Sequence, residues 1–161
     1  MPESDAIRIR EATLDDIPTI IRHREMMFSD MGVYSPEQFR DLVPVSETYF
    51  RKAMASGGYR AWVAETEDGR VVAGGGIVIS HWPGYPGSSQ PRRAWILNMY
   101  TEPEFRRRGI ARRLMQTMVE WLRTEGFPSV SLHASDEGRL VYQAMGFKPT
   151  NEMRLDLTER C

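Results

Sequence analysis

The residues with the clearest chemical potential are the five arginines between positions 106 and 113, a stretch that holds no acidic residue. Its core reads Arg106-Arg107-Arg108-Gly109-Ile110-Ala111. An apolar segment typical of a strand, 94–101, precedes this core, and an amphipathic segment typical of a helix, 110–125, follows it. A glycine turn that opens a helix directly after a strand leaves backbone N–H groups free at the positive end of the helix dipole. The sequence therefore predicts an anion-binding site at this turn.

The overall charge of the chain limits what this anion can be. The 161 residues carry a net charge of -1, with 41% hydrophobic and 27% charged residues, which is typical of one globular domain, 1–161. This balance gives no general attraction to nucleic acid or to a membrane, and neither is expected as a partner. A local positive spot on a mildly acidic protein favours a small anionic ligand.

Other composition signals are few. The single cysteine, Cys161, excludes an internal disulfide, and no metal site is expected. The first five residues lack the basic and apolar regions of a signal peptide, and no apolar run approaches membrane-spanning length. A cytoplasmic location is therefore expected.

The spacing of hydrophobic residues and the positions of glycine and proline predict the helices and strands that position the arginine turn. Alternation predicts strands at 7–10, 59–66, 71–80, 94–101, 130–134, 147–148 and 153–157. Helical spacing predicts helices at 14–31, from 36 to a break at Pro44, at 46–55, at 110–125 and at 138–145. Asp68-Gly69 predicts a tight hairpin turn, and Gly74-Gly75-Gly76 predicts a bulge or a close approach of another backbone. This order of elements indicates a mixed α/β fold.

Two motifs then carry a resemblance to a known family. Arg106, Gly109 and Ala111, with Pro103 upstream, resemble the acetyl-CoA signature of the GCN5-related N-acetyltransferases (GNAT), Gln/Arg-x-x-Gly-x-Gly/Ala after a strand. Downstream, Tyr142-Gln143-Ala144-Met145-Gly146-Phe147 resembles the Tyr-x-x-x-Gly-Phe ending of that family. The resemblance implies a GNAT-like fold, in which a mostly antiparallel sheet of about seven strands, flanked by about four helices, splays to admit coenzyme A.

The resemblance also implies where acetyl-CoA would bind as the cosubstrate. Backbone N–H groups of the turn would hold its pyrophosphate, and the flanking arginines are candidates for its 3′-phosphate. The backbone of the preceding strand would pair with the pantetheine arm. Ser135 stands where the family often has an asparagine that contacts this arm. The implied set is Met99, Tyr100, Thr101, Arg106, Arg107, Arg108, Gly109, Ile110, Ala111 and Ser135.

Catalytic roles are implied for two residues. Tyr142 resembles the general acid of the family, which returns a proton to the departing thiolate. His133 is the first candidate for the general base, because it shares strand parity with Ser135. Other candidates for this base are His23, Glu25, Asn98 and Tyr100.

These observations favour an N-acetyltransferase that transfers the acetyl group of acetyl-CoA to a primary amine of a small molecule or peptide by direct attack. A coenzyme A-binding regulatory or sensor module with little catalysis is the alternative, since the base is not evident. A nucleotide phosphate loop and a nucleic-acid site are weaker alternatives. Residues 1–50 hold ten acids and five arginines, so a cationic amine is the expected acceptor. A homodimer is left open.

Overall fold

The computed structural model describes residues 6–158, and its central element is a five-stranded sheet in the order β1-β2-β3-β4-β5. All neighbouring strands are antiparallel except β4 and β5, which are parallel. The strands span Arg8–Glu11, Tyr59–Glu65, Val71–His81, Arg92–Thr101 and Ser131–Leu132. The mixed α/β class and the mostly antiparallel sheet are as the sequence predicts.

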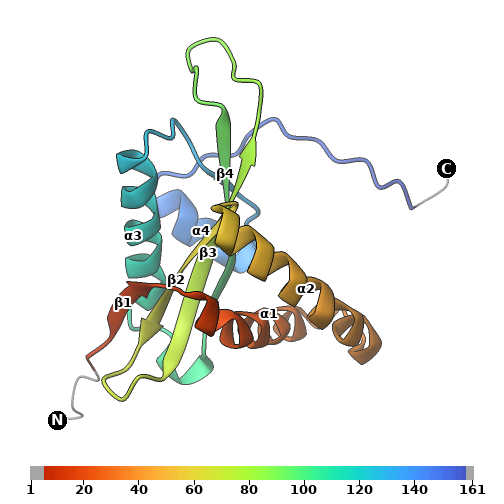
Figure 1. The fold of residues 1–161 in the computed structure, drawn as a ribbon, viewed down its shortest axis with the longest axis vertical. Coiled ribbons are helices and arrows are strands. Elements are labelled where there is room, and N and C mark those ends of the chain that lie inside the picture. The colour runs from red at the N-terminus through yellow and green to blue at the C-terminus, as the bar shows by residue number, and fades with distance from the viewer. Residues whose placement is uncertain (1–5, 159–161) are drawn as a thin grey trace.

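Helices cover both faces of this sheet (Figure 1). On one face α3 packs its apolar stripe, including Leu114, Met115 and Met118, against β2, β3 and β4. On the other face α1 and α2 enclose a second apolar cluster around Ile17, Phe50 and Tyr59. The helices α1 to α4 span Ile17–Met31, Pro36–Ser56, Ile110–Thr124 and Asp136–Ala144, and two short 3-10 turns, η1 and η2, span Leu14–Asp16 and Pro103–Phe105.

Strand β4 carries a bulge in its second half. Gly74 pairs with Tyr100 and Gly76 with Leu97, so the single residue Gly75 of β3 lies opposite two residues of β4, Asn98 and Met99. Asn98 adopts a left-handed backbone conformation with φ of 60°, which is the arrangement that lets an extra residue enter a ladder. The irregularity expected at the glycine run is confirmed, but the extra residue lies on the neighbouring strand.

The predicted break of the second helix at Pro44 is wrong, because α2 continues from Pro36 to Ser56 through the proline. The ring of Pro44 is exposed, so it meets no packed neighbour there. A proline inside a helix removes one hydrogen bond and costs about 3 kcal/mol. Burial of Ser46, Phe50 and Ala53 further along the same helix offsets that cost.

The predicted count of about seven strands is also wrong. The strand expected at 130–134 is reduced to Ser131–Leu132, and the segments 147–148 and 153–157 form no strand. Among the described residues, no backbone hydrogen bond joins 148–155 to another segment, and a strand exists only through pairing with a neighbour. The last helix begins two residues earlier than predicted, at Asp136.

Some sequence-based expectations fall outside the described residues. Met1 to Asp5 and Cys161 lie there. Within residues 6–158, no helix is both long enough and apolar enough to cross a membrane. The same residues contain no group of three metal-ligating side chains.

Candidate active site

The arginine turn joins the end of β4 to the start of α3. Gly109 is the residue before the helix and has φ of 74°, and Arg107 is also left-handed with φ of 62°. The first backbone bond of the helix runs from the Arg113 N–H to the Gly109 carbonyl oxygen, 3.1 Å away. No backbone acceptor within residues 6–158 meets the N–H groups of Gly109, Ile110 or Ala111. The turn therefore has the free donors that an anion needs.

The arginine side chains of the turn differ in their roles. Arg106 anchors it, because its Nε donates to the Thr101 carbonyl oxygen at 2.8 Å and its Nη2 meets an Asp30 carboxylate oxygen at 2.9 Å. Its guanidinium also lies 5.5 Å from the centre of the Tyr100 ring. Arg107 and Arg108 are exposed, and Arg108 lies over the Phe105 ring. Arg106 thus holds the turn against β4, whereas its two neighbours face solvent.

Strands β4 and β5 part directly beside this turn. Among the described residues they pair only at Trp95–Ser131 and Ile96–Leu132. Within the same residues β4 has no partner strand on that side from Leu97 to Thr101, and the bulge at Asn98–Met99 lies in this unpaired half. The opening exposes the backbone of Met99, Tyr100 and Thr101 at a sheet edge. It agrees with the splayed strands that the sequence predicts, and it leads from the anion-binding turn to the bulge.

Helix α4 follows β5, the strand on the other side of the opening. Tyr142 is half-buried, packs against the α3 core and lies 5.8 Å from the Phe147 ring, and this burial raises the pKa of its phenol. Ser135 caps the helix, its Oγ accepting from the Gly138 N–H at 3.1 Å. A Cβ on Gly138 would lie 3.0 Å from the Tyr142 ring. The glycine therefore makes room for Tyr142, and Ser135 has a capping role that the sequence did not indicate.

The predicted base, His133, is exposed and follows β5. Its ring stacks on Trp95, with centroids 4.9 Å apart and planes inclined by 24°. It shares a groove of about 500 Å³ with Tyr142. Its role as base stays a prediction.

The second histidine candidate, His23, lies in a buried ionic cluster. Its Nε2 is 3.2 Å from Oε1 of Glu102, which also meets Arg22 at 3.2 Å and contacts Arg70. Burial lowers the pKa of His23 despite the carboxylate beside it. Burial alone would raise the pKa of Glu102, but hydrogen bonds from His23 and Arg70 bring it below its usual range. This cluster ties α1 to the end of β4.

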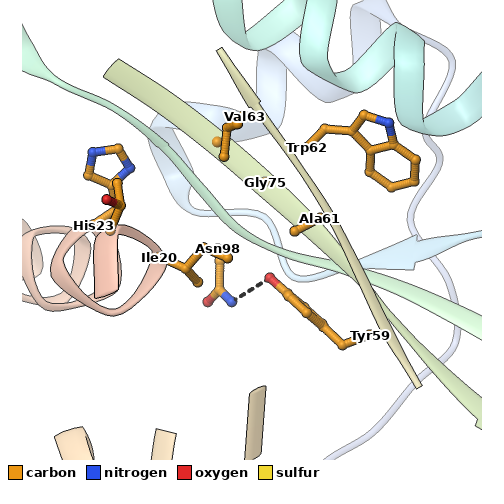
Figure 2. A pocket seen from close by; sticks show the side chains of 10 residues that line it. Ile20, His23, Tyr59, Ala61, Trp62, Val63, Gly75 and Asn98 are labelled. Carbon is orange, nitrogen blue, oxygen red and sulfur yellow. Dashed lines mark hydrogen bonds between the residues drawn. The ribbon is translucent and has the colours of Figure 1, made fainter. Parts of the chain in front are cut away.

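A third polar group, which the sequence did not reveal, surrounds the bulge on the α1–α2 side. Figure 2 shows Asn98 pointing toward the buried Tyr59, and its Nδ2 donates to the Tyr59 hydroxyl at 3.0 Å. Burial raises the pKa of Tyr59 to about 12. The Asn98 Oδ1 accepts from Nη1 of Arg24 at 2.5 Å. A cavity of about 10 Å³, lined also by Ile20 and His23, adjoins this group (Figure 2).

Several acidic residues of the N-terminal third form ion pairs. Carboxylates on η1, α1 and α2 pair with arginines, in the pairs Asp16–Arg10, Asp30–Arg106, Glu37–Arg40 and Glu47–Arg51. Among the described residues, no ion pair joins Asp15, Glu25 or Asp41 to an arginine or a lysine, so the expected cationic acceptor stays a prediction.

The fold agrees with comparison to known proteins. The family model described as acetyltransferase (GNAT) family matches residues 23–147. The chain therefore belongs to the GNAT acetyltransferase family, whose members use acetyl-CoA. The resemblance and the fold class predicted from the sequence are confirmed.

Individual proteins that are similar to this chain differ from it at most of the aligned positions. A GCN5-related N-acetyltransferase from Ralstonia eutropha JMP134 is 31% identical, with a TM-score of 0.86 over 96% of this chain and 100% of that chain. A structure described as a predicted acetyltransferase with acetyl-CoA, from Clostridium acetobutylicum, is 28% identical, with a TM-score of 0.87 over 96% and 99%. Human N-acetyltransferase 8 is 27% identical over 70% of this chain, and the chain spans about half the length of that relative, 47%.

Proposed function

We propose that the protein transfers the acetyl group of acetyl-CoA to a primary amine of a small molecule or peptide by direct attack. The observation that carries this proposal is the opening between β4 and β5. It has free N–H donors at Gly109 to Ala111 and a bulge at Asn98–Met99, and Tyr142 lies in a groove beside β5. An extended thioester with a phosphate-bearing arm has the shape and charge that such an opening accepts.

Binding of the arm would use backbone groups. The N–H groups at the start of α3 hold the pyrophosphate, and Arg107 and Arg108 are the proposed partners of the 3′-phosphate. The unpaired β4 edge at Met99–Thr101 pairs with the pantetheine amides. Ser135 donates its hydroxyl proton to this arm while its oxygen continues to cap α4.

In the reaction, the bulge and the two side chains have separate tasks. A backbone N–H near Met99 or Tyr100 polarises the thioester carbonyl and stabilises the developing oxyanion. The amine nitrogen forms a bond to the carbonyl carbon, and the carbon–sulfur bond then breaks. Tyr142 gives its proton to the thiolate, and His133 accepts the proton that the amine loses. The raised pKa of Tyr142 keeps the phenol protonated until the thiolate forms.

Replacement of Tyr142 by phenylalanine tests this proposal. We expect Tyr142→Phe to lower kcat about 100-fold or more, because the thiolate loses its proton donor, and to leave coenzyme A affinity nearly unchanged. Thiol release measures kcat, and calorimetric titration with coenzyme A measures affinity. Tyr85→Phe, in the exposed loop before β4, is the matched control. Full turnover in Tyr142→Phe at saturating substrate would remove Tyr142 from the mechanism.

The sensor alternative makes a different prediction with the same assay. Coenzyme A binding without thiol release across a broad panel of amines would favour a regulatory module over an enzyme.

A further inference from the structure

Arg24 of α1 is a half-buried cation that has no carboxylate partner. Its Nη1 donates to Asn98 and its guanidinium lies 4.9 Å from the centre of the Phe28 ring, but its Nε is buried with no hydrogen-bond acceptor. Within residues 6–158, no Asp or Glu oxygen lies within ion-pair distance of it. Arg22 and Arg70, which are more exposed, both pair with Glu102.

An unpaired cation in such a place is energetically unusual. Burial disfavours the charged form, and it lowers the pKa of Arg24, although a guanidinium stays protonated at neutral pH. The phenol groups of Tyr49 and Tyr59 also lie near enough to Arg24 to act on its charge. An incoming carboxylate would supply the missing counter-charge, and the planar fork of the guanidinium binds that group bidentately.

The position of Arg24 relates it to the reaction. Its partner Asn98 is the first residue of the β4 bulge and precedes Met99, where the proposed function places the thioester carbonyl. We propose that Arg24 binds a carboxylate of the acceptor, so that the preferred acceptors are amino acids and related amino carboxylates. This inference rests on the proposed function, and it replaces the cationic acceptor that the N-terminal acids suggested.

Pairs of amino acids and their primary amides test this inference. L-Phenylalanine and L-phenylalaninamide, and L-methionine and its amide, would be compared by thiol release from acetyl-CoA. The acid-to-amide ratio of kcat/KM should fall tenfold or more in Arg24→Gln, mainly through a higher KM for the acid. The acid and the amide of a pair differ in the pKa of their amines. This difference affects the wild type and Arg24→Gln equally, so it cancels when their acid-to-amide ratios are compared. Arg22→Gln, on the same helix, should keep the wild-type ratio.

The outcomes separate this inference from the proposed function. Acetylation of both classes with an unchanged ratio in Arg24→Gln would overturn the role of Arg24 and leave the acetyltransferase intact. Absence of thiol release with every amine would defeat the proposed function. Calorimetric titration of each acid and amide onto the coenzyme A complex then decides the role of Arg24. No acid binding tighter than its amide, or no loss of that preference in Arg24→Gln, would overturn it.

Discussion

At the scale of single residues, three polar clusters with different charge balances surround the unpaired half of β4, two of them around buried residues and the third exposed. His23 and Glu102 form one with two arginines. Asn98 and Tyr59 form the second with Arg24, which has no acid. Arg106 links Thr101 to Asp30 in the third. Such contacts hold α1 against β4, where the bulge would otherwise weaken the sheet.

The imidazole of His23 should make stability depend on pH. Because burial lowers its folded-state pKa, the unfolded chain binds the extra proton as pH falls below about 6.5, and stability decreases from there downward. Urea denaturation at pH 7, 6 and 5 measures this slope. We expect His23→Gln to have a shallower slope over this range. Glu102, whose pKa is lowered, contributes its own loss only at lower pH. Equal slopes in both proteins would contradict the assignment.

At the scale of elements, the start of α3 combines a left-handed Gly109 with a helix whose first donors are free. Gly109→Val should weaken coenzyme A binding about tenfold or more, because valine resists a positive φ and its methyl groups crowd the N–H groups. Arg108→Ala removes one exposed charge and should weaken binding less. Gly109→Asn, which tolerates this conformation, is the control. Calorimetric titration with coenzyme A measures all three variants. A larger effect of Arg108→Ala than of Gly109→Val would contradict the proposal that backbone N–H groups contribute more to binding than the arginine side chain does.

Pro44 lies inside α2, where it lowers the stability of the folded protein because it removes one helical hydrogen bond. Pro44→Ala restores a helical hydrogen bond at an exposed position and should stabilise the protein by about 1–3 kcal/mol. Urea denaturation monitored by circular dichroism measures the change. A destabilised variant would mean that the proline ring makes a contact of value in the folded protein.

At the scale of the whole molecule, the sheet separates two apolar clusters, one under α3 and one under α1 and α2. The opening between β4 and β5 divides the sheet in another direction, into β1–β4 and β5, and within residues 6–158 two residue pairs join these two halves of the sheet. A ligand that spans the opening would join the halves, and its binding free energy would add to the stability of the fold.

Coenzyme A should therefore raise the melting temperature. At about 100 times its Kd a ligand stabilises by about 2.7 kcal/mol, which corresponds to about 5–10 °C for a chain of this size. Differential scanning calorimetry with and without coenzyme A measures the shift, with adenosine as the control that lacks the pyrophosphate. An unchanged melting temperature at high coenzyme A concentration would contradict binding in the opening.

The sequence by itself determined the local features. The hairpin at Asp68-Gly69, the helix ends at Gly32 and Gly57, and the turn before α3 follow from φ preferences and caps within a few residues. The two motifs indicated the family because they are contiguous in the chain. These signals need no knowledge of which distant segments meet.

Only the tertiary structure decided the features that depend on non-local partners. The bulge at Asn98 comes from register against β3, and the missing C-terminal strands come from the absence of a neighbour within the chain. In sequence, Arg24 resembles any other helical arginine, and only the structure shows that its Nε is buried without a hydrogen-bond partner among the described residues. Pairing, burial and counter-charges are properties of residues far apart in sequence, and local patterns carry no record of them.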